Sequence, residues 1–61
     1  MEQKVLDQFI ALLKEDDTGA IVYLEQHENE FKAHFSEIIV NHITESLLEF
    51  DFEKALALVT T

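Results

Sequence analysis

Cysteine and proline are absent from this 61-residue chain, and glycine occurs once. Without cysteine, neither a disulfide nor a thiolate metal site can hold the fold together. The glycine and proline clusters that normally bound short strands are also missing, so a β-sheet has few places to begin or end. These absences exclude a disulfide scaffold and favour helices.

Positive charge is scarce as well, because four Lys and Arg residues face thirteen Asp and Glu residues and give a net charge of −9. Such a charge repels the phosphates of nucleic acids and anionic lipid surfaces, so we expect a protein partner, no nucleic acid and no membrane. Apolar runs such as Phe9 to Leu13 and Ala55 to Val59 are five residues long, far too short to span a bilayer. The charged amino end lacks a signal-peptide core, which predicts a cytoplasmic protein.

The length predicts one domain, residues 1–61, near the lower limit at which a single core supports a fold. Hydrophobic residues make up 48% of the chain and can form a core. No disulfide or structural metal is expected to add to the stability of that core. Small domains of this kind often gain further burial by association. We therefore expect dimerisation to complete the fold.

Apolar residues recur at three- and four-residue spacing through most of the chain, which is the pattern of amphipathic helices. In the first stretch, Val5, Phe9 and Leu13 share one face. Asp16 or Asp17, and later Asp51, precede apolar stretches and offer side-chain oxygens that cap helix starts. The pattern predicts an all-α fold of four helices in two hairpins, at about residues 2–15, 17–27, 30–49 and 51–60.

An internal repeat with an offset of 35 residues supports two hairpins. The segment Leu12-Leu13-x-x-Asp16-x-x-x-Ala20-Ile21-x-x-Leu24 recurs as Leu47-Leu48-x-x-Asp51-x-x-x-Ala55-Leu56-x-x-Val59. In each copy paired leucines close one helix, an Asp caps the next, and a small Ala lets the two helices approach closely. Each copy therefore encodes a helix–turn–helix unit.

The same residues carry a resemblance to a known family. The pattern Leu12-Leu13…Asp17-x-x-Ala20…Tyr23-Leu24-Glu25, then Phe31, then Phe50-Asp51-Phe52-Glu53-Lys54-Ala55-Leu56 resembles the short helical region at the carboxyl end of many bacterial hybrid sensor kinases and related response-regulator proteins. The likeness runs from about Leu12 to Leu58. It implies a non-enzymatic accessory module in two-component signalling. Because no receiver or kinase segment is present, we expect an excised domain or a free-standing relative.

A broad apolar stripe on the predicted helix at 30–49 is the candidate interface. A helix of this length buries only part of such a stripe within a 60-residue fold, and exposed apolar surface on a small domain marks an interaction site. His42 lies within the stripe and is expected to be a core or interface histidine, or a proton-sensitive switch at the interface. The predicted interface residues are Phe31, Phe35, Ile38, Ile39, His42 and Ile43.

Two other functions compete with the interaction module. His34 could accept a phosphoryl group, as in histidine phosphotransfer proteins, although Glu37 and Ile38 stand where a Lys and a Gly normally follow that histidine. Alternatively, the charge of −9 could let the chain imitate nucleic acid and block a basic partner. Phosphodonor labelling would identify the first function, and salt-sensitive binding to a basic protein the second.

Motifs for catalysis, metals or cofactors are incomplete. Asp17-Thr18-Gly19 spells the aspartic-protease triplet once, whereas that chemistry needs two copies. His27-Glu28 begins a zinc motif, but Phe31 occupies the place of the second histidine. The alternative is a weak surface site of His27 with His34 or Glu30, against an ordinary solvent-facing histidine in a turn. We therefore expect no enzyme, no cofactor and no metal.

Overall fold

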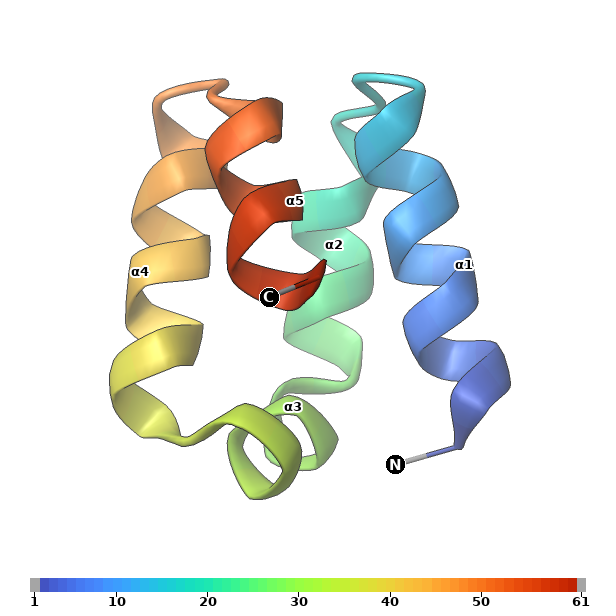
Figure 1. Cartoon of the computed structure of the whole chain (residues 1–61), viewed down its shortest axis with the longest axis vertical. Helices are drawn as coiled ribbons and strands as arrows, with labels where there is room; N and C mark the ends of the chain where they lie inside the picture. The colour runs from blue at the N-terminus through green and yellow to red at the C-terminus, as the bar shows by residue number, and fades with distance from the viewer. Residues whose placement is uncertain (1, 61) are drawn as a thin grey trace.

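The computed structural model describes residues 2–60, and all regular structure in this range is α-helical (Figure 1). This confirms the all-α prediction. The described residues form five helices rather than the four expected, and each turn between them is short. The helices are α1 (Gln3–Lys14), α2 (Gly19–Gln26), α3 (Glu28–Phe35), α4 (Glu37–Leu48) and α5 (Phe52–Thr60).

The helix predicted at 30–49 is wrong as a single element, because the chain breaks at Ser36. Ser36 has φ 99° and ψ 158°, a region that glycine usually occupies. Its side-chain oxygen accepts a hydrogen bond from the amide of Ile39 at 3.4 Å and caps the start of α4. A straight helix from 30 to 49 would be about 30 Å long, longer than the 24 Å maximum dimension of the domain. The break lets α3 fold back and bury Phe31.

The turn between α1 and α2 is a Schellman motif. Asp16 adopts the left-handed conformation, with φ 52°. Its amide donates to the carbonyl of Leu13 at 3.2 Å, and the amide of Asp17 donates to the carbonyl of Leu12 at 3.0 Å. These two bonds satisfy carbonyls that the end of a helix leaves without partners.

The turn between α4 and α5 has the same geometry. Phe50 is left-handed, with φ 57°, its amide donates to the carbonyl of Leu47 at 3.0 Å, and the amide of Asp51 donates to that of Ser46 at 2.8 Å. Glycine adopts the left-handed conformation freely and Asp or Asn adopts it at times, whereas it is costly for other residues such as Phe. Here it falls on Asp16 and Phe50, so the two turns share a conformation without sharing a residue type.

The two turns correct the register of the repeat. They match at an offset of 34, not 35, so Leu13 corresponds to Leu47 rather than to Leu48. The burial of the leucines supports the offset of 34, because Leu13 and Leu47 are buried whereas Leu48 is exposed. After the turns the expected offset of 35 holds, since Ala20 and Ala55 are both completely buried. The second copy therefore contains one additional residue at its turn.

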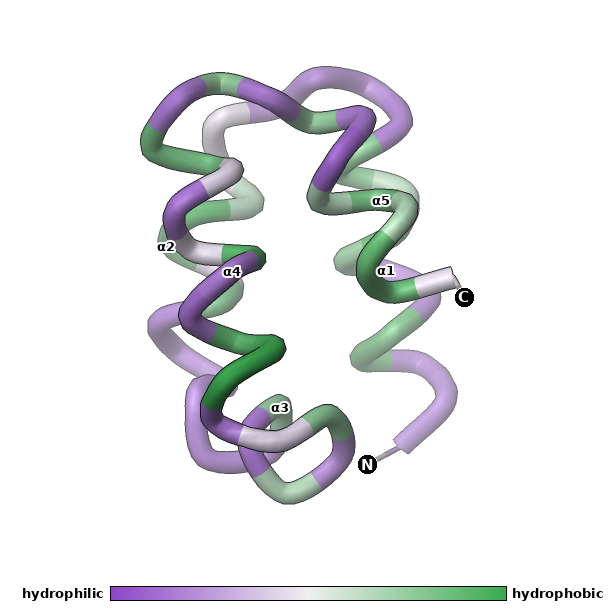
Figure 2. The backbone as a smooth tube through the Cα atoms, turned by 60° about the vertical axis from the view of Figure 1, so that its left-hand side comes forward, coloured by the Kyte–Doolittle hydropathy of each residue, from purple (hydrophilic) through white to green (hydrophobic). Residues whose placement is uncertain are grey.

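The helices surround one core. α1 packs against α2 and α5, α4 packs against α5, α3 and α2, and α3 closes the end of the domain opposite the two turns (Figure 1). Apolar and polar residues alternate along the helices, as the hydropathy colouring shows (Figure 2). No helix among residues 2–60 has both the length and the apolar content needed to cross a bilayer. The core consists of Phe9, Leu13, Ala20, Leu24, Phe31, Val40, Ile43, Leu47, Phe52, Ala55 and Val59.

Candidate functional site

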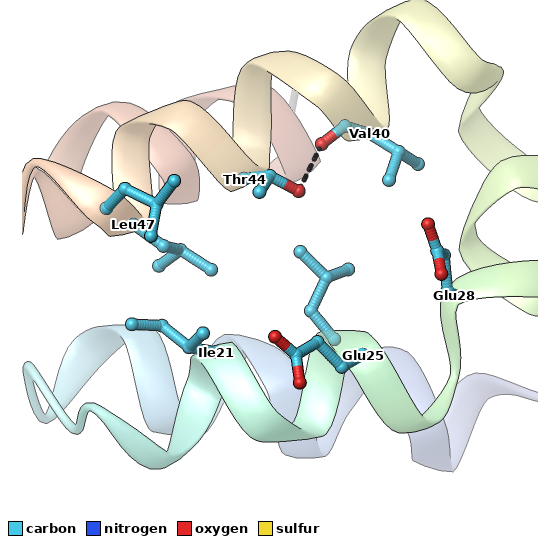
Figure 3. Close-up of a pocket in the computed structure, with 8 residues that line it drawn as sticks. Ile21, Glu25, Glu28, Val40, Thr44 and Leu47 are labelled. Atoms are coloured by element: carbon cyan, nitrogen blue, oxygen red, sulfur yellow. Dashed lines mark hydrogen bonds between the residues drawn. The ribbon is translucent and has the colours of Figure 1, made fainter.

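A groove of about 520 Å³ runs between α2 and α4. Buried core side chains form its floor, since Leu24, Val40 and Leu47 are 4%, 2% and 1% exposed, so the apolar surface open to a ligand comes from Ile21 and Leu48. Two carboxylates also belong to its lining. In Figure 3 the apolar side chains of Ile21 and Leu47 lie at one end and Glu28 at the other. The lining residues are Ile21, Leu24, Glu25, Glu28, Val40, Thr44, Leu47 and Leu48.

The groove offers few free hydrogen-bond donors to a polar ligand. Thr44 is the one lining residue with a side-chain hydroxyl, and this hydroxyl donates to the carbonyl of Val40 at 2.9 Å (Figure 3). A hydroxyl carries a single proton, so Thr44 has none left to donate. The groove therefore suits apolar groups.

Leu48 gives the groove an apolar edge that reaches solvent. It is 64% exposed at the last residue of α4, whereas Ile21 on α2 is half-buried and packs against the core. An exposed leucine beside a concave apolar surface is typical of a binding site, whereas scattered exposed leucines are common on any protein. Because Leu48 lies beside the groove, its exposure marks the groove as a candidate binding site.

The carboxylates of the groove differ in their surroundings. Glu28, the first residue of α3, forms an ion pair with Lys32, with an N–O distance of 3.1 Å. Glu25 lies in the last turn of α2, on an exposed part of the surface. No basic residue belongs to the groove lining to neutralise Glu25.

The predicted interface residues do not form one stripe, because the break at Ser36 places them on two helices. Phe31 and Ile43 are 0% exposed and belong to the core, so neither contributes surface to a partner in this conformation. The others, Phe35, Ile38, Ile39 and His42, retain partial or full exposure.

Among these four, Ile38 is the best candidate for contact with a partner, since this apolar side chain is 69% exposed at the start of α4. Phe35 and Ile39 are half-buried and pack against the core. The side chain of His42 is exposed, so of the two expected positions, core or interface, the core is wrong and the interface stays a prediction. The apolar surface left of the predicted stripe is the exposed Ile38 with the half-buried Phe35 and Ile39, and we refer to these three residues as the Ile38 patch.

The other two histidines lie on or beside α3. His34 is exposed, and its ring meets the ring of Phe35 edge-on with centroids 4.6 Å apart. His27 Nδ1 lies 3.0 Å from Glu30 Oε1, and its ring lies 4.6 Å from that of Tyr23. Within residues 2–60 no three His, Cys, Asp or Glu side chains gather as a metal site would require.

The triplet Asp17-Thr18-Gly19 is part of a turn. One carboxylate oxygen of Asp17 accepts a hydrogen bond from the amide of Gly19 at 2.8 Å, at the start of α2. In the other turn, Asp51 accepts from the amide of Lys54 at 3.1 Å. Asp51 thus caps α5 as predicted, whereas Asp17 lies one residue before the N-cap residue Thr18 and binds the first amide of α2. Asp16, the other candidate for this cap, occupies the left-handed position of the turn instead.

Sequence reasoning missed the α2–α4 groove. The repeat places Leu48 at the end of a helix and gives no indication that the helices of Ile21 and Leu48 lie side by side. The predicted offset of 35 pairs Leu48 with the buried Leu13, and the offset of 34 that pairs it with the exposed Lys14 is evident only from the hydrogen bonds of the turns, so the sequence did not mark Leu48 as exposed. No protein-family model matches the chain, and no curated protein and no solved structure matches it either. Function is therefore inferred from the geometry and charge of its own residues.

Proposed function

We propose that this chain is a non-enzymatic, cytoplasmic protein-interaction module that binds an amphipathic helix of a partner in the α2–α4 groove. The observation that carries the proposal is the groove itself, an apolar depression of about 520 Å³ with an exposed leucine at its edge. Elsewhere the surface is rich in acidic residues. Grooves between helices are a recurrent way of binding the apolar face of a third helix.

The dimensions agree with a helical ligand. α2 has 8 residues and α4 has 12, so the walls are about 12 and 18 Å long at 1.5 Å per residue. Apolar anchors at positions i, i+4 and i+7 of a ligand helix span about 10 Å. Three such anchors fit within the length of the shorter wall.

Self-association through the Ile38 patch is a second candidate function. Ile38 is 69% exposed and lies between the half-buried side chains of Phe35 and Ile39 in sequence order along the α3–α4 junction. A two-fold pair would let the same patch meet itself. This patch is distinct from the groove, so a dimer could still bind a ligand helix. A role in two-component signalling is supported by the sequence resemblance alone.

The groove proposal is tested by nuclear magnetic resonance on the ¹⁵N-labelled chain. Three 12-residue peptide helices share Leu anchors at i, i+4 and i+7 and differ only in their polar positions, which are all Lys, all Gln or all Glu. At least one peptide should shift the amides of Ile21, Thr44 and Leu48. The variant Leu48→Glu should lose the response, whereas Val22→Glu, at an exposed position of α2 outside the groove lining, should keep it. Failure of all three peptides at millimolar concentration would overturn the proposal.

A further inference from the structure

We infer that the ligand of the α2–α4 groove is a basic amphipathic helix that brings a Lys or Arg side chain to Glu25. The inference rests on the proposed function and names the chemistry of the partner. Glu25 and Glu28 are the charged lining residues of an otherwise largely apolar groove. A ligand that covers the apolar part also reaches these carboxylates.

The distribution of positive charge leaves the groove without a cation for Glu25. All four basic residues of the chain are lysines, and none of them lies on α2 or α4. The nearest in sequence, Lys32, is engaged by Glu28 at 3.1 Å. The positions of the four are Lys4, Lys14, Lys32 and Lys54. Glu25 is thus an acidic group that an incoming cation can neutralise.

Charge also argues against the other occupants. A second copy of this chain would bring another net charge of −9 toward the groove, and like charges at close range oppose association. The helices that form the groove walls carry no Lys or Arg and would add the carboxylates of Glu25, Glu37 and Glu45 beside the imidazole of His42. Acidic peptides meet the same repulsion, whereas a basic helix gains attraction over the whole surface.

The groove further specifies where the ligand carries its charge. Ile21 and Leu47 lie at the end nearest the two turns, and Glu28 lies at the end nearest α3 (Figure 3). The apolar anchors of the ligand therefore extend toward the turns. Its cation lies toward α3, within reach of Glu25.

The peptide series defined above also tests this inference. The Lys peptide should bind at least tenfold more tightly than the Gln peptide in 50 mM salt, and the Glu peptide most weakly. The advantage of the Lys peptide should shrink at 500 mM salt, because exposed charges are then screened. Glu25→Gln should weaken its binding about two- to fivefold, as expected for one exposed ion pair.

Glu45→Gln supplies the matched control. It removes the same charge from an exposed position of α4 that does not line the groove, so it should change the affinity less than Glu25→Gln. Equal affinity for the Lys and Gln peptides would overturn the inference while leaving the groove function in place. Equal effects of the two Glu→Gln variants would also overturn it, because attraction would then come from net charge alone. No binding by any peptide would remove the proposed function itself.

Discussion

The rings of Phe9 and Phe31 meet edge-on in the centre of the domain, with centroids 4.9 Å apart and planes at 60°. Both side chains are completely buried. Edge-to-face pairs of this kind add to the stabilisation that burial alone provides. Because Phe9 lies on α1 and Phe31 on α3, the pair attaches the short α3 to the core.

Phe31→Ala should therefore unfold the domain or nearly so. Truncating a buried Phe costs about 3–5 kcal/mol, and a domain of this size has a total stability of about 3–9 kcal/mol. Val22→Ala is the control, since Val22 is 55% exposed within α2 and its truncation should change stability by no more than about 0.5 kcal/mol. Urea unfolding followed by circular dichroism measures both. A well-folded Phe31→Ala protein would show that Phe31 is not a core residue.

The backbone conformation of Ser36 and its capping hydrogen bond predict opposite effects on stability for two small substitutions. Ser36→Gly should stabilise the domain by about 1 kcal/mol, because glycine adopts this backbone conformation with less strain and costs only a few tenths of a kcal/mol as a cap. Ser36→Ala keeps the strain and loses the hydrogen bond to the amide of Ile39. It should destabilise by about 0.5–1 kcal/mol. Thermal melts of both variants would contradict this account if their order were reversed.

Asp51 should contribute to stability through its side-chain oxygen. Asp51→Ala removes the acceptor for the amide of Lys54 and should cost about 0.5–2 kcal/mol. Asp51→Asn retains a capping oxygen and should remain close to the parent protein. The comparison by thermal unfolding separates the hydrogen bond from the negative charge. A loss in Asp51→Asn equal to that in Asp51→Ala would assign the effect to charge.

Self-association through the Ile38 patch predicts a dimer that Ile38→Asp dissociates. The substitution places a charge on an apolar surface that the pair would bury, while Ile38 makes little contribution to the monomer core at 69% exposure. Val22→Asp is the matched control, because Val22 is exposed on α2, away from the patch. Sedimentation analysis at high micromolar protein concentration measures the oligomeric state of the parent protein and both variants. A monomeric parent protein, or a dimer that tolerates Ile38→Asp, would remove this second function.

His34 should accept no phosphoryl group from a phosphorylated receiver. Glu30 lies one turn before His34 on α3, and Glu37 begins the next helix, so carboxylates precede and follow the imidazole. The negative charge of a phosphoryl group is disfavoured beside them. Acid-labile label that appears on the protein and disappears in His34→Ala would make phosphotransfer the function.

Local patterns predicted the helices well because amphipathic spacing and capping aspartates act over a few residues. α2 begins at Gly19 and α5 at Phe52, within one or two residues of the predicted starts at 17 and 51. The break at Ser36 was missed because no glycine or proline interrupts the stretch. Tertiary burial of Phe31 overrides the local preference for a continuous helix there.

The candidate site was less predictable than the helices. Phe31 and Ile43 share an apolar pattern with Ile38, and sequence alone assigned all three to one exposed stripe. Which apolar residues remain exposed depends on how the helices pack after the break. The groove likewise exists only because α2 and α4, separated in sequence by α3, lie side by side.

No helix of the domain exceeds 12 residues among those described. Helices shorter than about 12–15 residues are marginal in water by themselves, so each depends on the others for its hydrogen bonds. Such interdependence makes folding cooperative, and amide exchange from the buried parts of all five helices should proceed through one global opening. A ligand that fills the groove would then protect α1 and α5, which it does not touch, as strongly as α2 and α4.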